Sequence, residues 1–360
     1  MRIIVDVMGG DNAPLEILRG TYAASQEYSA SFILVGDREK IEYVAEENGF
    51  DLRRFEIVDT KTVITMEDDP LCVVRSKSDS SMSTALKLLS EGRGDAVVSA
   101  GNSGALFTGA SLIVRKIRGV KRAAIGSVLP FNPPVLLLDS GANIEVTDDC
   151  LLQFAAMGAA YMRNYYGVEN PRVGLLNNGA EDCKGTELQL NAYKRLSAEK
   201  DINFVGNIEG NQLAFDACDV LVTDGFTGNI LLKSVEGMGK LMITELKNLF
   251  LSSNVSKISA LLVKKHIKEL KHQYDSSEHG GAPILGISRP VIKAHGSSNA
   301  KAFKNAIRQA IAVVDTGVTY DIAKEAEKFE ARRRAEIAAK HAEKEAQEKN
   351  ERIAEEQSRA

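Results

Sequence analysis

Short apolar runs that end at glycine, asparagine or aspartate recur along most of the chain. They cover residues 3–7, 32–35, 96–99, 135–138, 173–176 and 220–223. Runs of this length, bounded by turn residues, are typical of strands that are buried on both faces. Segments with helical spacing of apolar residues lie between them, among them 14–26, 82–89 and 150–164. The alternation predicts an α/β fold with a mostly parallel sheet and helices on both faces.

Two segments do not follow this alternation. In residues 254–274, large apolar side chains recur at helical spacing and lysines occupy many of the other positions. We therefore expect one α/β domain over residues 1–320, with an amphipathic helical protrusion at about residues 240–278. Residues 321–360 are rich in charges of both signs and contain no glycine or proline. This composition predicts a charged C-terminal tail that is either a solvated helix or disordered.

The composition narrows the classes of function. Lys and Arg number 45 against 49 Asp and Glu, and the resulting net charge of −4 offers no general attraction for nucleic acid. No apolar run reaches the length of about 18 residues that a transmembrane helix needs. The four cysteines lie far apart, without the spacing of a zinc site or of a disulfide framework. These features favour a cytoplasmic protein that does not bind nucleic acid.

Six predicted strand ends carry turns rich in glycine, asparagine, serine and aspartate. These turns are residues 9–12, 101–104, 139–143, 177–179, 224–229 and 295–299. Glycine lets the backbone approach a ligand closely, and exposed N–H groups at a helix start attract anions. A single turn of this kind is more often an ordinary helix cap. Six turns, which we expect on one edge of the sheet, favour a binding site for a phosphate-like anion.

The usual patterns of cofactor and metal sites are missing from the sequence. Residues 237–240 lack the first glycine and the final hydroxyl residue of a P-loop, and no dinucleotide fingerprint follows the first strand. The histidines do not have the helical spacing of zinc hydrolases. We therefore expect neither a cofactor nor a metal ion.

Three side chains near the turns are candidates for chemistry. Cys183 lies beside Asp182 and Lys184, but a small side chain without a nucleophilic role is the more frequent case. Lys184 follows the 177–179 turn, so its ammonium group either faces an anion or lies in solvent. His295 precedes a serine-rich turn and either donates to a ligand oxygen or packs as a hydrogen-bonded histidine.

Taken together, the motifs resemble those of the bacterial phosphate acyltransferases, which make acyl phosphates from acyl carrier protein thioesters. The resemblance rests on residues 6–14, 99–105, 224–229, 280–283 and 293–298, in this order along the chain. Val7 and Ser103 differ from the alanine and threonine that are frequent in the family, but they preserve the size or the hydroxyl group. The charged tail from about residue 321 is longer than the family leads us to expect.

The resemblance implies a three-layer α/β/α sandwich similar to the isocitrate and isopropylmalate dehydrogenases, a homodimer, and a peripheral role in phospholipid synthesis. The substrates would be acyl carrier protein in its acylated form and inorganic phosphate, and the acyl phosphate would pass to a membrane acyltransferase. A phosphate dianion can attack a thioester without a general base. A thiol with a pKa of about 8.5 leaves readily. This chemistry is compatible with the lack of a catalytic triad.

We predict that the turns supply positioning and oxyanion stabilisation for this reaction. The catalytic candidates are Lys184, His295 and Asn229. The candidates for binding phosphate or substrate are Gly10, Asp11, Asn12, Asn102, Ser103, Asp224, Ser297 and Ser298. Asp11 and Asp224 either orient the donors or only cap helices.

The basic amphipathic segment suits an acidic partner. Its candidate contact residues are Leu261, Leu262, Lys264, Lys265 and Lys268. Acyl carrier protein, an anionic membrane and the second protomer of a homodimer all stay open as partners.

Other functions also stay open. A short-chain phosphotransacetylase would perform the same chemistry on coenzyme A, and a non-catalytic scaffold that binds acyl carrier protein would use the turns only structurally. A hydroxy-acid dehydrogenase of the related fold would need a nicotinamide site and metal-binding carboxylates.

Overall fold

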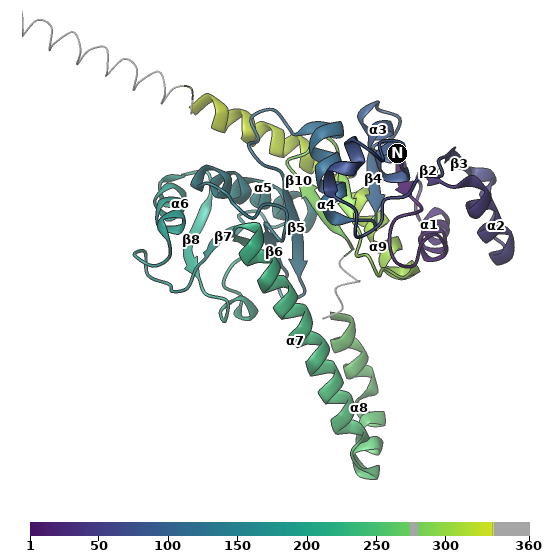
Figure 1. Ribbon diagram of the computed structural model, residues 1–360. Coiled ribbons are helices and arrows are strands. Elements are labelled where there is room, and N and C mark those ends of the chain that lie inside the picture. Colours follow the sequence, from purple (N-terminus) through teal and green to yellow (C-terminus); the bar gives the residue numbers. More distant parts are fainter. Residues whose placement is uncertain (274–279, 333, 335–360) are drawn as a thin grey trace, which may run out of the picture.

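A computed structural model describes residues 1–273, 280–332 and 334. Its described part contains an 11-stranded sheet with the strand order β3-β2-β1-β4-β11-β10-β5-β6-β9-β7-β8 (Figure 1). The strands are β1 (Arg2–Asp6), β2 (Ser31–Gly36), β3 (Phe55–Asp59), β4 (Ala96–Ser99), β5 (Ala124–Leu129), β6 (Val135–Leu138), β7 (Arg172–Leu176), β8 (Asn203–Ile208), β9 (Val220–Val222), β10 (Ala282–Leu285) and β11 (Val291–Lys293). Every apolar run that was predicted as a strand forms one.

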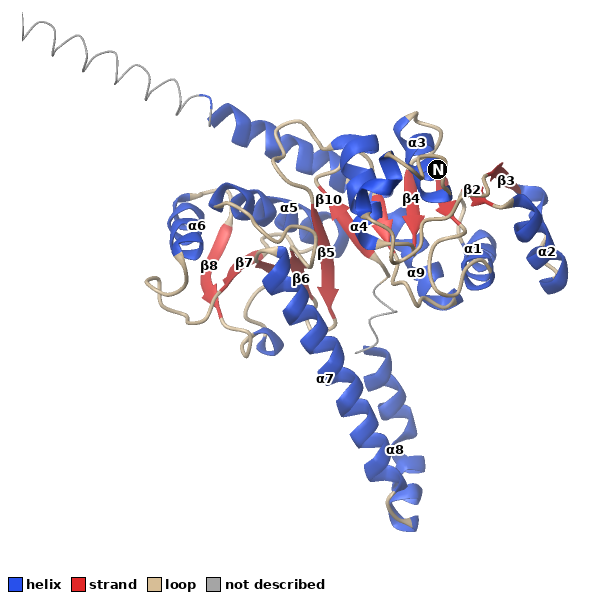
Figure 2. Ribbon diagram, in the orientation of Figure 1, coloured by secondary structure: helices blue, strands red, loops and turns tan. Residues whose placement is uncertain are grey.

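Helices separate most of these strands along the chain (Figure 2). They are α1 (Leu15–Glu27), α2 (Arg38–Asn48), α3 (Ser81–Ser90), α4 (Ser103–Gly109), α5 (Asp148–Tyr166), α6 (Glu187–Ala198), α7 (Gly225–Leu251), α8 (Asn254–Gln273) and α9 (Ala300–Asp315). The three helical segments predicted from apolar spacing are α1, α3 and α5.

Helices cover both faces of the sheet. Because successive residues of a strand point to opposite faces, Ile3 and Val5 of β1 belong to the cluster that includes α1, α5 and α9, whereas Ile4 packs with α3 and α4. In the other half of the sheet, Leu137 of β6 packs with Leu231 of α7. The predicted three-layer α/β/α sandwich is confirmed.

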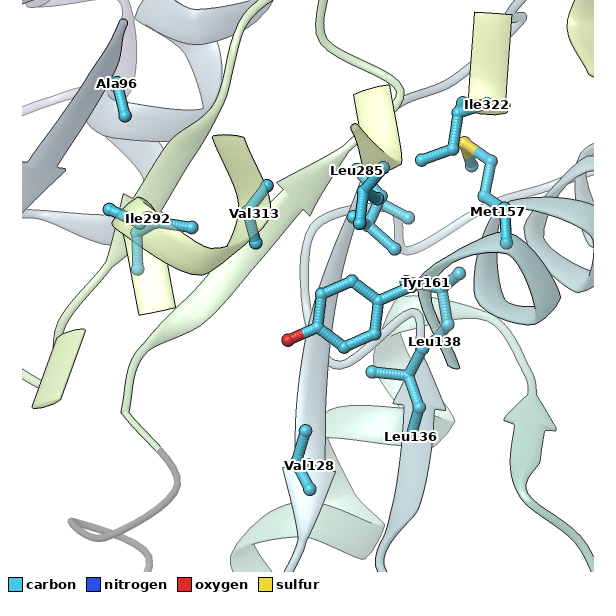
Figure 3. Packing of buried hydrophobic residues seen from close by; sticks show 14 of the residues in the cluster. Ala96, Val128, Leu136, Leu138, Met157, Tyr161, Leu285, Ile292, Val313 and Ile322 are labelled. Carbon is cyan, nitrogen blue, oxygen red and sulfur yellow. The ribbon is translucent and has the colours of Figure 1, made fainter. Parts of the chain in front are cut away.

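The largest apolar cluster is continuous beneath both halves of the sheet. It extends from Ile292 of β11 through Leu285 of β10 to Leu138 of β6, with Tyr161 of α5 between them (Figure 3). Tyr161 is fully buried, and its hydroxyl oxygen accepts a hydrogen bond from Gln309 Nε2 at 2.9 Å. The two halves of the sheet therefore share one core.

The strands do not all run in the same direction, and this separates the six turns. β3, β2, β1, β4 and β11 are parallel. β10 is antiparallel to both β11 and β5, and β6 is antiparallel to β5. The parallel set β6, β9, β7 and β8 consequently runs opposite to β1, β4 and β11. The expectation that all six turns share one edge is wrong, because an apolar run locates a strand without giving its direction.

Helices α7 and α8 project from the body of the protein as an antiparallel pair (Figure 1). The first turns of α7 pack on β5 and β6, and the rest of the helix extends away from the sheet. The protrusion expected at about residues 240–278 is therefore this helical pair, and it begins within α7. Tyr274 and the rest of residues 274–279 lie outside the described residues.

The chain crosses the expected boundary at residue 320 as a helix that covers residues 318–332. Val318, Ile322 and Ala326 on this helix are buried in the main apolar cluster. Arg332 forms ion pairs with residues that precede β8. Residues 335–360, which make up most of the expected tail, lie outside the described residues, and the boundary itself stays a prediction.

Candidate functional site

A row of three polar residues closes the adjacent strands β1, β4 and β11. Asp6, Ser99 and Lys293 are the last residues of these strands and are in register with one another. Their exposed fractions are 1%, 0% and 9%. The Ser99 hydroxyl donates to Asp6 Oδ2 at 2.6 Å. We call these three residues the buried row.

The buried row contains two groups that titrate unusually. Burial raises the pKa of Asp6, although the hydroxyl groups of Ser99 and Ser81 and the charge of Lys293 favour its carboxylate form. Burial also lowers the pKa of Lys293 to about 8, against the opposing influence of Asp11 and Asp6. Because burial in a medium of low polarity disfavours the charged form of either group, both shifts have the same physical cause.

Three of the glycine-rich turns interlock above the buried row. Residues 9–12 are the first turn, 101–104 the second and 295–299 the third. The Asp11 N–H donates to the Gly296 carbonyl oxygen at 2.8 Å. Asn12 Nδ2 lies 3.2 Å from the Ser297 carbonyl oxygen and 3.3 Å from that of Ser298. Gly10 has a φ of +104°, and a Cβ there would lie 3.0 Å from the Gly296 oxygen, so the turn requires glycine. The first and third turns hold five of the predicted binding residues. The structure therefore brings together Gly10, Asp11, Asn12, Ser297 and Ser298.

Asn102 connects the second of these turns to a neighbouring loop. Its Oδ1 accepts from the Ala105 N–H at 3.0 Å and so caps α4, whose first residue is Ser103. Its Nδ2 donates at 3.1–3.2 Å to three carbonyl oxygens, those of Thr65, Met66 and Asp68. Both ends of the carboxamide are thus engaged within the chain.

His295 lies on the third turn and is exposed. Its Nδ1 accepts from the Ser297 N–H at 3.2 Å and lies 2.9 Å from the Ser297 hydroxyl. The neutral ring therefore carries its proton on Nε2, where it is available as a donor. Although the residue is exposed, the surrounding chain partly desolvates the ring and so lowers the pKa of His295, and the positive charge of Lys233 lowers it further while Glu236 opposes this. The neutral form consequently predominates near neutral pH.

The turns after β6 and β9 form a second group. Asp139 is fully buried, and its carboxylate accepts from the N–H groups of Gly141 at 3.1 Å and Asn143 at 2.7 Å. Burial nevertheless raises the pKa of Asp139. The Gly225 N–H donates to the Asn143 carbonyl oxygen at 2.7 Å. A Cβ on Gly228 would lie 1.9 Å from the Asp139 carbonyl oxygen, so α7 begins in direct contact with this turn.

Three predicted residues lie at this second edge of the sheet. Asp224 caps α7, because its carboxylate accepts from the Thr227 N–H at 2.8 Å. Asn229 is exposed on the first turns of α7, beside Gly141. Lys184 is exposed after β7, and its carbonyl oxygen accepts from Asn177 Nδ2 at 3.1 Å. Among the described residues, no hydrogen bond joins Asn229 or Lys184 to the three interlocked turns.

Helix α7 extends from the second group towards the first. The charge of Lys233 lowers the pKa of both Lys293 and His295, so this helix contributes to the field at the interlocked turns. The two edges are separated by short strands, since β11 has 3 residues and β6 has 4. β11 and β6 are also three strand spacings apart in the sheet, so, with 3.2–3.4 Å per residue along a strand and 4.7–4.9 Å between strands, the two groups are separated by roughly 17–20 Å. Only an elongated substrate could span this separation.

Sequence reasoning did not single out Asp6, Ser99, Lys293 or Lys233 as site residues. A charged residue that closes an apolar strand is the signal that could have identified Asp6 and Lys293. Lys233 carries no such signal, because only the packing of α7 places its charge near the site. Cys183 is exposed, and the other cysteines are buried.

Two features are absent from the described residues. No cluster of three or more His, Cys, Asp and Glu residues there is arranged to hold a metal ion. No helix in this part of the chain is long and apolar enough to cross a membrane.

The helical pair presents many exposed apolar side chains, which we call the hairpin surface. They are Met238, Leu241, Met242, Ile243, Leu249, Leu251, Val255, Ile258, Leu261, Leu262 and Val263. Leu261 and Leu262 are 70% and 81% exposed. Lys264 and Lys265 are also exposed on α8, whereas the side chain of Lys268 lies outside the described part.

Solved structures with a similar fold include phosphotransacylases. A phosphotransacetylase from Streptococcus pyogenes matches with a TM-score of 0.59 at 15% sequence identity, over 87% of this chain and 94% of the other. A branched-chain phosphotransacylase from Enterococcus faecalis matches with a TM-score of 0.53 at 16% identity, over 87% and 99% of the two chains. At these identities the likeness shows the fold alone.

Comparison of sequences gives a closer relationship. The phosphate acyltransferase of Clostridioides difficile is 44% identical over 324 residues, which are 89% of this chain and 95% of the relative. The phosphate acyltransferase of Acetivibrio thermocellus is 46% identical over 318 residues, or 88% and 94% of the two chains. The family model described as "Fatty acid synthesis protein" matches residues 1–321. The chain therefore belongs to this family, and the resemblance of its motifs to phosphate acyltransferases is confirmed.

Proposed function

We propose that this chain transfers an acyl group from acyl carrier protein to inorganic phosphate, releasing acyl phosphate and the free carrier protein. The acyltransferase class follows from the family and from relatives that share more than two-fifths of the sequence. The main observation that supports this location of the site is the interlocking of three glycine-rich turns above the buried row.

The proposed reaction needs few protein groups. A phosphate oxygen forms a bond to the thioester carbonyl carbon, the carbon–sulfur bond breaks, and the thiolate leaves with the electron pair and takes up a proton. Phosphate would lie against the first and third turns, near Gly10, Asp11 and Ser297. The Nε2–H of His295 would then donate to the oxyanion that develops on the carbonyl oxygen. Its neutral state, favoured by partial desolvation of the ring and by Lys233, suits this role.

The second group would serve the acyl carrier protein side of the substrate. Asn229 and Lys184 are both exposed at that edge, so they are accessible to a macromolecular partner. Asp224 would position the start of α7, which it caps. Asn102 would position the neighbouring loop, to which it donates at the Met66 carbonyl oxygen. Ser103 and Ser298 flank the same turns, and Asn12 joins two of them.

Trapping the product tests this function. The purified chain is incubated with inorganic phosphate and either acyl carrier protein or coenzyme A that carries the same acyl group, and hydroxylamine converts acyl phosphate to a hydroxamate. We expect hydroxamate to form faster from acyl carrier protein and only when phosphate is present. Faster formation from the coenzyme A thioester would support a phosphotransacetylase instead. No hydroxamate from either substrate would support the non-catalytic scaffold.

We also propose that the hairpin surface contacts an anionic membrane peripherally. At the end of the helical pair, Val255, Ile258, Leu261 and Leu262 are exposed, and lysines accompany them on α8. Exposed apolar residues with a basic flank are typical of helices that lie in the membrane interface. A homodimer is the remaining proposal, and it is tested by sedimentation equilibrium of the whole chain.

Vesicle binding tests the membrane proposal. The chain should pellet with anionic vesicles in a salt-sensitive manner, and Leu261→Glu with Leu262→Glu should abolish pelleting because both side chains are more than two-thirds exposed. The matched control is Leu112→Glu, which changes an exposed leucine far along the chain from the hairpin surface. Unchanged pelleting of the double variant would reject membrane contact. Loss of acyl carrier protein binding instead would assign the surface to that partner.

A further inference from the structure

Lys293 is a charged side chain at the centre of the apolar sheet, and the proposed chemistry does not yet use it. Its strand neighbours Val291 and Ile292 are 1% and 0% exposed, and the lysine itself is only 9% exposed. Burying a charge is unfavourable unless the group is paired or hydrogen-bonded. A methionine would fill a similar space without this cost. The presence of lysine there therefore calls for a function that depends on its charge.

The ammonium group of Lys293 contacts two of the interlocked turns. It donates to the carbonyl oxygen of Ala100 at 3.4 Å and to that of Ala294. Ala100 directly precedes the second turn, and Ala294 directly precedes His295 on the third. The Ala294 N–H also donates to the Ser99 carbonyl oxygen at 2.9 Å. One cation therefore fixes the starting points of two turns on adjacent strands.

The rest of the buried row extends this contact to the first turn. The Ser99 hydroxyl accepts from the Gly101 N–H at 3.1 Å while it donates to Asp6. A Cβ on Gly9 would lie 2.6 Å from Asp6 Oδ2 and 2.7 Å from the Gly101 nitrogen, so the first turn lies directly against both groups. The buried row is thus the common base on which all three turns rest.

We propose that Lys293 is a positioning residue for acyl transfer to phosphate, whose ammonium group holds the second and third turns in register with the first. The proposal rests on the proposed function, and it assigns Lys293 no contact with the reacting atoms. It accounts for a buried cation whose donors point at backbone carbonyl oxygens of the site.

The charge state of Lys293 makes the proposal measurable. A neutral amine has one donor fewer than the ammonium and presents a lone pair, so its hydrogen bonds to the two carbonyl oxygens weaken on deprotonation. With a pKa of about 8, this deprotonation falls within the range of an ordinary assay. The charged groups that face Lys293 are Asp6 of β1, Asp11 of the first turn and Lys233 of α7. His295 also faces this region but titrates below its usual pKa, on the acid side of the profile.

The experiment compares wild type with Lys293→Met, Lys293→Arg and the control Lys304→Met. Lys304 lies on α9 and pairs with Glu27, outside the site. We expect the kcat/KM for phosphate of the wild type to fall above pH 8. In Lys293→Met, kcat/KM should be reduced roughly 100-fold, the effect of a misplacement of about 1 Å. The pH profile of this variant should also lack the fall above pH 8, which we call the alkaline limb. Lys293→Arg should recover part of the activity without a limb near pH 8, because arginine stays charged.

Two results of the activity measurements would overturn the proposal. One is a wild-type pH profile and activity in Lys293→Met, and the other is an alkaline limb near pH 8 that persists in Lys293→Arg. The arginine variant keeps the test decisive if the methionine variant does not fold. Amide hydrogen exchange gives a readout that does not depend on turnover. Lys293→Met should speed exchange at residues 100–104 and 294–298 but not at 139–143, and equal exchange in all three segments would refute positioning.

Failure of the proposed function is distinguishable from failure of this inference. A wild-type chain that forms no acyl phosphate contradicts the function, and the exchange measurement then decides the structural role of Lys293 alone. An active wild type with an unchanged Lys293→Met variant contradicts only the inference.

Discussion

The start of α7 approaches the turn after β6 more closely than any side chain allows. A Cβ added to Gly228 would lie 1.9 Å from the Asp139 carbonyl oxygen and 3.0 Å from Thr223 Cγ2, whereas ordinary contact begins at 3.4 Å. The atom that the Cβ meets first belongs to the backbone, so no change of rotamer relieves the overlap. Replacing Gly228 by Ala must therefore move α7 or the turn.

The expected loss of stability follows from this overlap. Overpacking in a tight interior costs about 1–3 kcal/mol and occasionally more. Moving α7 also weakens the hydrogen bond from the Gly225 N–H to the Asn143 carbonyl oxygen, 2.7 Å long, and such a bond contributes about 1 kcal/mol. The higher helix propensity of alanine offsets about 1 kcal/mol of this loss of stability. We expect Gly228→Ala to lower the free energy of unfolding by about 3 kcal/mol.

Urea unfolding of two glycine variants of the same helix measures this effect. Gly237 also lies within α7, but an added Cβ would meet nothing within 4 Å. Gly237→Ala should therefore raise the free energy of unfolding by up to about 1 kcal/mol. Gly228→Ala should in addition slow acyl phosphate formation, because it displaces Asn229 and Lys233. If both variants were as stable as the wild type, the close contact between α7 and the turn after β6 would be refuted.

Three further predictions concern the site itself. Lys184→Ala and His295→Ala should each lower phosphate-dependent acyl transfer by about 100-fold or more with an unchanged circular dichroism spectrum, and near-normal turnover in both would contradict their assignment. Asn102→Asp retains the cap of α4 but places an acceptor against three carbonyl oxygens, so it should lose about 2–3 kcal/mol in urea unfolding; wild-type stability would reduce Asn102 to a cap. The pKa of Lys293 is about 8 in the folded chain, against 10.5 for an unperturbed lysine, so only the unfolded state binds a proton between these pH values. The free energy of unfolding of the wild type should therefore rise by about 3 kcal/mol relative to Lys293→Met from pH 8 to pH 10.5, and parallel stability curves would show that Lys293 titrates normally.

Much of the site could be predicted because its chemistry is encoded locally. Gly10 needs a positive φ, and Asp224 caps the helix that it precedes, so both are recognisable from a few neighbouring residues. The exposure of Leu261 and Leu262 likewise follows from an amphipathic pattern with no strand beside it. His295 could be predicted as a candidate, but its tautomer depends on the Ser297 amide and its pKa on Lys233.

The sequence by itself determined where strands, helices and turns lie, because apolar period and turn chemistry act over a few residues. Only the tertiary structure decided how the turns are grouped. The antiparallel strands β10 and β5 reverse the direction of the second half of the sheet, so the turns after β6, β7 and β9 lie opposite those after β1, β4 and β11. The same long-range packing buries Asp6 and Lys293 on either side of Ser99 and directs Lys233 of α7 towards them. Strand direction and side-chain burial depend on residues far apart in the chain, and no local pattern carries them.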